Sequence, residues 1–357
     1  MMAAIDLRAY GLTEAVERHV RTVPEYEDMV VGRVLTQAKG LYRVVAERGE
    51  VLAEVSGKLR HEARQVVDFP AVGDFVLIDR ADDAGGRAII RHVVERSSAF
   101  VRKAAGTALG QQVVAANIDT VFLCMSLEGD FNLRRLERYL ALAWESGAVP
   151  VVVLTKADRC DNLPRRLWAV ESVALGVDVV AVSSSDQDGY ANVLPYLVPG
   201  KTVALLGSSG VGKSTLVNHL LGKNAFETRE VGADGRGRHA TTRRELVLLP
   251  GGALVMDTPG MRELGMWDAS AGLEQGFADV ERLFASCRFS NCTHTSEPGC
   301  AVYEALAQGE LSERRWQAYR KLKTEEAFAG DKASYLAEKE RKYKNISKAI
   351  KQLPEKR

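Results

Sequence analysis

The stretch Gly207-Ser-Ser-Gly-Val-Gly-Lys213-Ser214 decides how the rest of this chain is interpreted. It matches the pattern GxxxxGK followed by Ser or Thr. It comes after the apolar segment 202–206, for which we expect a strand, and before residues 214–221, for which we expect a helix. At such a turn, backbone N–H groups and the positive end of the helix surround phosphate groups. The stretch therefore predicts a P-loop with a nucleoside triphosphate as its ligand.

Two side chains of this loop have separate tasks. We expect the Lys213 ammonium to reach the β- and γ-phosphates and the Ser214 hydroxyl to bind Mg²⁺. The residues expected to contact the nucleotide here are Gly207, Ser208, Ser209, Gly210, Val211, Gly212, Lys213, Ser214 and Thr215. The loop alone does not identify the base.

A second motif, Thr155-Lys156-Ala-Asp158, predicts that the base is guanine. It follows the apolar segment 149–154, the position at which GTPases carry Asn or Thr, then Lys, any residue and Asp. The Asp158 carboxylate can accept hydrogen bonds from N1–H and N2–H₂ of guanine, a pair of donors that adenine lacks. Lys156 is expected to lay its apolar stem along the base. Ser183 and Ser184, at the end of the next expected strand, are predicted to back the base.

A third motif, Asp257-Thr-Pro-Gly260, again follows an apolar segment. In a P-loop enzyme the aspartate holds Mg²⁺ through water, and the glycine N–H senses the γ-phosphate. The Gly-rich basic segment 230–242 lies between the P-loop and this motif and is a candidate mobile switch. One of its two threonines, Thr241 or Thr242, is expected to reach Mg²⁺, and the sequence does not decide which.

Turnover is expected to be slow without a partner. Many signalling GTPases have a water-positioning Gln directly after the third motif, whereas this chain has Met261, and a thioether does not orient water in that way. His239, close to the two threonines, is the candidate for positioning the water. The alternative is a surface histidine with an RNA-binding or structural role.

The order of the motifs indicates a circular permutation. GTPases ordinarily run from the P-loop through the switch threonine and DxxG to the guanine motif and the serine loop. Here the guanine motif and the serines come before the P-loop, in a cyclic rotation of that order. Apolar segments alternate with helical patterns from 118 to 257, which predicts a mainly parallel sheet covered on both faces. The expected strands are 119–126, 149–155, 177–183, 201–207 and 252–257, with a helix over 133–146.

Residues 29–94 predict a small barrel. Five short β segments with Gly-bearing turns and no helical period fit an OB-like or an SH3-like barrel, and composition does not choose between them. Basic and aromatic residues are interspersed there, which suits RNA binding; a basic face turned only to solvent is the alternative. These residues are Arg33, Lys39, Tyr42, Arg43, Lys58, Arg60, Arg64 and Phe69.

Three of the five cysteines fall close together near the C-terminus. With a neighbouring histidine they supply three thiolates and one imidazole, a full tetrahedral set for structural zinc with no position open for catalysis. Reduced thiols packed in a core are the alternative. The expected ligands are Cys287, Cys292, His294 and Cys300.

The composition of the 357 residues, 46% hydrophobic and 27% charged, is that of a soluble globular protein. No segment approaches the ~20 apolar residues of a membrane span. Asp6 and Arg8 interrupt the apolar run that a secretory signal needs, so we expect a cytoplasmic protein without disulfides. The net charge is only +1, so nucleic acid has to bind through local basic patches. One candidate is 339–357, with eight Lys or Arg against two Glu; a merely solvated helix is the alternative.

Together these motifs resemble the ribosome small-subunit-dependent GTPases of the RsgA/YjeQ family. The resemblance covers nearly the whole chain, from VGRV in the barrel through VVAANIDTVF, GSSGVGKSTLVN, GRHATT, DTPGMRELG and the cysteine cluster. It implies a multidomain α/β chain, with an N-terminal arm and OB-like RNA-binding barrel in 1–112, a circularly permuted GTPase in 113–265, and a helical zinc-binding domain with a basic C-terminal helix in 266–357. One departure is Thr155, where many members have Asn. Loss of the amide is expected to loosen the base site, while Asp158 keeps the guanine contact.

The resemblance also implies what the chain works with. It implies GTP or GDP with Mg²⁺, one structural Zn²⁺, and GTP hydrolysis stimulated by the 30S ribosomal subunit. It further implies binding of 16S rRNA and a role in late maturation of that subunit; we expect a monomer that does not bind membranes. Two other functions stay open. One is an RNA-binding assembly protein that uses nucleotide only as a structural ligand, and the other is an ATP-dependent kinase, which has no reason to carry the guanine motif in this order.

Overall fold

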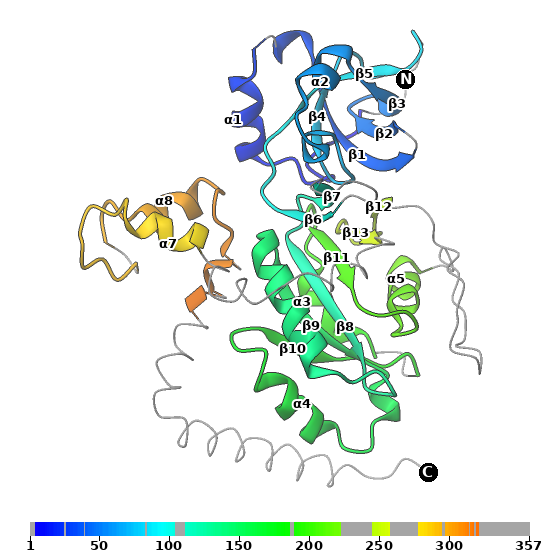
Figure 1. Cartoon of the computed structure of the whole chain (residues 1–357), viewed down its shortest axis with the longest axis vertical. Helices are drawn as coiled ribbons and strands as arrows, with labels where there is room; N and C mark the ends of the chain where they lie inside the picture. Colours follow the sequence, from blue (N-terminus) through cyan, green and yellow to red (C-terminus); the bar gives the residue numbers. More distant parts are fainter. Residues whose placement is uncertain are drawn as a thin grey trace.

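The computed structural model describes residues 4–24, 26–38, 40–82, 84–103, 111–185, 189–222, 245–257, 278–294, 297–313, 315–317 and 319–320. Figure 1 shows a barrel at one end, a sheet flanked by helices below it, and a small helical segment to the side. Within these described ranges, no helix is both long and apolar enough to cross a bilayer.

The barrel consists of five strands that close on themselves. They pair in the order β1-β2-β3-β5-β4, and β4 returns to pair with β1. β3 and β5 run parallel, whereas the other pairs are antiparallel. Closure pairs both edges of the sheet, and the closed order confirms the OB-like barrel. The strands are β1 (Val30–Ala38), β2 (Leu41–Ala46), β3 (Gly49–Val55), β4 (Phe75–Ile78) and β5 (Ala88–Val93).

Two residues of the predicted RNA-facing set lie inside the molecule instead. Tyr42 is 2% exposed because alternate residues of β2 point into the barrel, which leaves its neighbour Arg43 on the outside. Arg33 of β1 is 1% exposed. The described members that do face solvent are Arg43, Lys58, Arg60 and Arg64, and Lys39 lies outside the described residues.

Arg33 joins the barrel to the sheet below it. Its guanidinium donates to the backbone carbonyls of Tyr10, Gly73 and Asn117 and, at 2.8 Å, to the hydroxyl of Thr202. Burial lowers the pKa of Arg33 to about 10, so the side chain is still a cation at neutral pH. We call this set of contacts the Arg33 junction.

The central sheet has the order β10-β9-β8-β11-β13-β12. All neighbours are parallel except β12, which is antiparallel to β13. The mainly parallel sheet is therefore confirmed. Its strands are β8 (Thr120–Ser126), β9 (Val149–Thr155), β10 (Asp178–Ala181), β11 (Thr202–Leu206), β12 (Glu245–Leu248) and β13 (Leu254–Asp257).

Helices cover both faces of this sheet. One face packs with α3 (Leu133–Ser146) and α4 (Leu163–Glu171), and the other with α5 (Lys213–Leu221). The strands are buried on both sides, which explains their continuous apolar runs. α3 spans the predicted residues because Asn132 caps its first turn and Gly147, with φ 86°, ends it.

Two connections tie the barrel to the sheet. The hairpin of β6 (Ala99–Lys103) and β7 (Gln111–Ala116) links them along the chain, and the expected domain boundary at 112 falls within β7. In addition, Thr36 of β1 pairs with Glu245 of β12, so barrel and sheet form one continuous eleven-stranded sheet.

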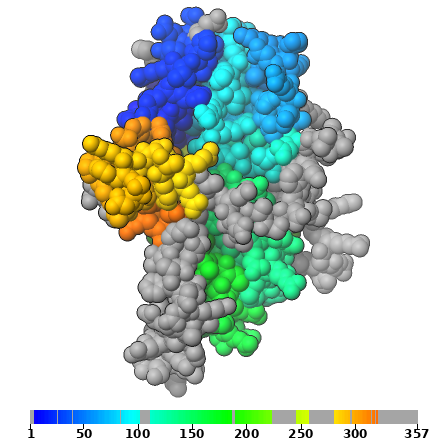
Figure 2. All heavy atoms as spheres, turned by 60° about the vertical axis from the view of Figure 1, so that its left-hand side comes forward, coloured from blue at the N-terminus to red at the C-terminus, as the bar shows by residue number. Residues whose placement is uncertain are grey.

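The C-terminal segment packs beside the sheet and the N-terminal helix. Its described residues include helices α7 (Ala278–Phe284) and α8 (Ala301–Ala307). Val302 and Trp316 share a core with Trp144 of α3. Arg18 of α1 (Glu14–Thr22) donates to the carbonyl of Gln308 at 2.7 Å. Figure 2 shows the C-terminal segment, in yellow and orange, against the N-terminal part of the chain, in blue.

Candidate nucleotide site and metal centre

The predicted motifs gather at one edge of the sheet. β8, β9, β10, β11 and β13 are parallel, so their carboxyl ends share that edge. From β8 the chain moves outward through β9 to β10, and from β11 it moves in the opposite direction to β13. The strand order thus reverses between β8 and β11, which is where open α/β sheets bind their ligands.

The P-loop occupies the turn from β11 to α5, as expected. A Cβ at Gly207 would lie 2.3 Å from the Cys124 carbonyl oxygen of β8, so no other residue fits there. Gly210 and Gly212 have φ angles of 75° and 98°, which side chains rarely allow. The Lys213 ammonium donates to the carbonyls of Gly207 and Ser208 at 2.7 and 2.6 Å. It is therefore held inside the curve of the loop.

Thr155 connects the guanine motif to the P-loop. Its buried hydroxyl donates to the Val211 carbonyl at 2.5 Å, and its side chain lies beside Gly212. The sequence suggested that replacing Asn by Thr removes contacts. The structure shows that the hydroxyl makes a direct bond to the P-loop. The two motifs, distant in sequence, are in contact.

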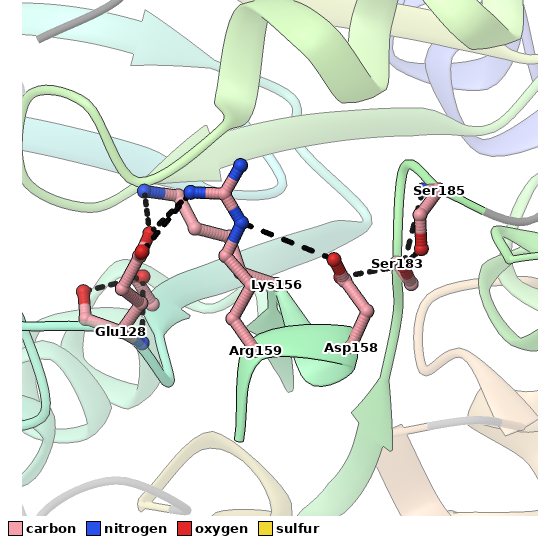
Figure 3. Close-up of polar contacts among 7 residues, drawn as sticks. Glu128, Lys156, Asp158, Arg159, Ser183 and Ser185 are labelled. Carbon is pink, nitrogen blue, oxygen red and sulfur yellow. Dashed lines mark hydrogen bonds and ion pairs between the residues drawn. The ribbon is translucent and has the colours of Figure 1, made fainter. Parts of the chain in front are cut away.

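Asp158 is oriented by the serine loop (Figure 3). Ser183 Oγ donates to Asp158 Oδ1 at 2.6 Å, and it also lies 2.7 Å from Ser185 Oγ. The hydrogen bond from Ser183 is the main cause that lowers the pKa of Asp158 below its ordinary value. The carboxylate is thus ionised and partly open to solvent, as an acceptor for guanine donors requires. The side chain of Ser184, the next residue, shares a hydrogen bond with Tyr190.

Glu128, which the sequence analysis did not single out, contacts the predicted guanine motif. It follows β8, and its carboxylate lies 3.0 Å from Lys156 Nζ and 3.0 Å from Arg159 Nη1. These two partners lower the pKa of Glu128. Lys156 has a positive φ of 57°, an unusual backbone conformation that its ion pair with Glu128 helps to hold. The sequence did contain a signal for Glu128, because this residue follows the carboxyl end of an expected strand, as the other motifs do.

Several predicted residues cannot be placed. His239, Thr241, Thr242 and Gly260 lie outside the described residues. Asp257 ends β13 at the expected edge, but its side chain is also outside the description. Of the remaining P-loop residues, Ser214 and Thr215 lie in the first turn of α5.

The four predicted zinc ligands converge. The ligand atoms of Cys287, Cys292, His294 and Cys300 all lie within 4.8 Å of one another. The Nδ1 atom of His294 is 3.5 Å from the sulfur of Cys287 and 3.6 Å from that of Cys300. Tetrahedral zinc, with bonds of about 2.3 Å to sulfur and 2.0–2.1 Å to nitrogen, separates these atoms by about 3.6 Å. The cluster therefore fits zinc, and Phe284 stacks on the His294 ring at 4.1 Å.

The fold and this edge of the sheet define a circularly permuted P-loop GTPase. β9, which precedes the guanine motif, and β11, which precedes the P-loop, lie on either side of β8. In the chain, however, the guanine motif comes before the P-loop.

Comparisons with known proteins agree. The family model for RsgA GTPase matches residues 93–267. The small ribosomal subunit biogenesis GTPase RsgA 2 of Lactiplantibacillus plantarum is 46% identical over 327 residues, 91% of each chain. The RsgA of Opitutus terrae is 48% identical over 313 residues, 85% of each chain. The crystal structure of YjeQ from Thermotoga maritima matches 83% of this chain and 98% of its own, with 26% identity and a TM-score of 0.52. The chain belongs to the RsgA GTPase family.

A model for ABC transporter also matches, over residues 191–348. This stretch contains the P-loop, a phosphate-binding element that many nucleotide-hydrolysing proteins share. It leaves out the barrel, β8, β9 and the guanine motif, which the RsgA relatives do cover.

Proposed function

We propose that this chain binds GTP with Mg²⁺ at the carboxyl edge of its central sheet, hydrolyses it to GDP and phosphate, and thereby serves late maturation of the 30S ribosomal subunit. The observation that carries the nucleotide part is the hydrogen bond from Thr155 to Val211. It brings the guanine motif and the P-loop together in one site. A P-loop without that neighbour would serve any nucleoside triphosphate.

The guanine base is assigned to one side of this contact. Asp158 accepts the two donors of the base, Lys156 lies along its face, and Ser183 and Ser184 back it. Ser183 already holds the Asp158 carboxylate at 2.6 Å, so little rearrangement is needed to receive guanine.

The phosphates are assigned to the P-loop, residues 207–215. Lys213 stabilises the charge that develops on the β- and γ-phosphates. Ser214, one of Thr241 and Thr242, and Asp257 through water hold Mg²⁺, which neutralises charge on the phosphate oxygens. Gly260 senses the γ-phosphate. His239 positions the attacking water, and because Met261 stands where many GTPases have a glutamine, turnover is slow until a partner stimulates it.

The partner is the small ribosomal subunit with its 16S rRNA. Relatives at 46 and 48% identity are named small ribosomal subunit biogenesis GTPases. The exposed Arg43, Lys58, Arg60 and Arg64 of the barrel supply positive charge for an RNA backbone. The protein acts in the cytoplasm as a monomer, and the cysteine cluster holds one structural Zn²⁺ that stabilises the C-terminal segment.

The test is GTP turnover measured with and without purified 30S subunits. We expect slow release of phosphate from the protein alone and a strong increase with subunits. Lys213→Ala, which removes the phosphate-binding ammonium, is the control and should abolish both. Turnover that stays absent with subunits, while GDP still binds, would favour the RNA-binding assembly protein that uses nucleotide as a structural ligand. Equal competition by ATP would remove the guanine assignment.

A further inference from the structure

A cavity of about 440 Å³ lies outside the nucleotide site, between the end of the guanine motif and helix α4. Three arginines line it, Arg159, Arg165 and Arg166, and apolar atoms come from Leu127, Phe131 and Ala169. No residue of the P-loop takes part in the lining. We call this the arginine cavity.

The charge of the arginine cavity is positive. The lining contains three arginine side chains and one carboxylate, that of Asp161. Arg159 is paired with Glu128 at 3.0 Å. Arg165 and Arg166 are exposed and make no ion pair with any residue in the described ranges. Because the chain as a whole has a net charge of only +1, this local excess of positive charge is a specific feature and not a general background.

One of these arginines is already stacked on an aromatic ring. The guanidinium carbon of Arg166 lies 4.2 Å from the centroid of the Phe131 ring. A stacked guanidinium keeps its planar edge of N–H donors free to bind a phosphate with two hydrogen bonds. Trp168, 38% exposed, lies one helical turn after Arg165 on α4. The cavity thus offers phosphate donors next to one lining aromatic ring, Phe131, and Trp168 lies outside the lining on the same helix.

We propose that the arginine cavity binds one nucleotide unit of single-stranded RNA, with the phosphodiester on Arg165 and Arg166 and the base against the aromatic face. The inference rests on the proposed partnership with rRNA and adds a contact on the GTPase part of the chain. The volume falls in the range of small-molecule pockets, so it holds one nucleotide and not a double helix. An acidic peptide would satisfy the charge but make no use of the aromatic ring. RNA uses both.

Cys160 makes the site directly measurable, because this partly buried thiol lines the same cavity. The experiment follows alkylation of Cys160 by iodoacetamide in the full chain, using peptide mass spectrometry. It compares no ligand with a saturating short single-stranded RNA. We expect RNA to slow the labelling about fivefold or more. Inorganic phosphate and GDP should leave the labelling rate unchanged.

The variant for this test is Arg165→Ala with Arg166→Ala. The matched control is Arg134→Ala with Arg138→Ala, which removes two exposed arginines from α3 that do not line the cavity. The cavity variant should lose RNA protection of Cys160, and the control variant should keep it. In RNA titrations the cavity variant should also reduce the salt slope by about 0.7 for each lost phosphate contact.

Three outcomes would overturn the proposal: no slowing of Cys160 labelling at saturating RNA, equal slowing by inorganic phosphate, or protection that survives in the cavity variant. The GTP assay stays independent of it, because neither double variant changes a residue of the nucleotide site. If subunit-stimulated turnover is normal and Cys160 protection is absent, only the arginine cavity is refuted. If turnover is absent from all proteins, the proposed function fails first.

Discussion

Two arginines of this chain belong to networks of opposite character. Arg33, at the junction of barrel and sheet, is almost completely buried and donates to three carbonyls and a hydroxyl. Arg159, beside the guanine motif, has a side chain that is 61% exposed and pairs with the exposed Glu128. The Arg33 network is closed to solvent, whereas the ion pair of Arg159 and Glu128 is exposed to it.

The contrast separates stability from ligand binding. A buried cation has lost its hydration, and its removal leaves buried carbonyls without donors, at about 1–3 kcal/mol for each. Exposed pairs contribute little to stability because water and salt screen them. Arg33 therefore holds the barrel on the sheet, whereas Glu128 and Arg159 pair beside the loop to which we assign the base.

The largest effect is expected from Arg33→Met. The substitution keeps much of the apolar stem but removes every donor of the Arg33 junction, so the free energy of unfolding should fall by about 3 kcal/mol or more. Urea unfolding followed by tryptophan fluorescence measures it. Arg43→Met, which removes an exposed arginine from the neighbouring strand, is the control and should change stability by less than about 0.5 kcal/mol. Equal effects of the two would mean that the junction is not a stabilising network.

The next largest effect is expected from Asp158→Asn, and in affinity instead of stability. An amide cannot accept from both N1–H and N2–H₂ as a carboxylate does, so GDP affinity should fall about 100-fold. Xanthosine diphosphate has a carbonyl in place of the N2 amine, and its affinity should rise relative to GDP. Calorimetric titration gives both values. An unchanged preference for GDP would place the base elsewhere.

A smaller effect is expected from Glu128→Gln. The amide keeps the shape of the side chain but loses the ion pairs to Lys156 and Arg159, so GDP should bind about threefold more weakly with the unfolding midpoint unchanged. Glu145→Gln on α3 is the control, since Glu145 is exposed and far along the helix from this loop. A drop in stability without a change in affinity would assign Glu128 to the fold and not to the base loop.

The smallest effect is expected from pH. The pKa of Asp158 is lowered from 3.8, so its carboxylate stays ionised above that value and its contribution to binding disappears only when the pH falls through the lowered pKa. The affinity of guanosine, which carries no phosphate that titrates in this range, should therefore be flat between about pH 5 and pH 8. A decline centred near pH 6.5 would show that a histidine, not Asp158, controls binding of the base.

The nucleotide motifs could be predicted from the sequence because each is local. The P-loop is recognised from glycines and a lysine that follow an apolar segment. The other motifs are each recognised from an aspartate within a few positions of the end of an apolar segment. The parallel sheet followed from the same segments, and α3 was predicted to its exact ends from its amphipathic pattern. The cysteine cluster was also found because its ligands lie close together in the chain.

Contacts between distant positions could not be predicted. Arg33 looks like any basic residue of a surface strand, because its partners Asn117 and Thr202 are 84 and 169 positions away. From the sequence, Thr155 was expected only to lose the amide contacts that Asn makes, because the Val211 carbonyl that it binds is 56 positions away. In both cases a polar side chain takes its role from tertiary structure, which residue type and local spacing do not encode.

The pairing of β1 with β12 has a mechanical consequence. Thr36 shares register with Glu245, which stands three positions after Thr242 in the chain. A pull or twist applied to the barrel therefore reaches β12 through the backbone hydrogen bonds of the shared sheet. An RNA bound to the barrel would therefore act mechanically on β12, the strand that comes next in the chain after segment 230–242.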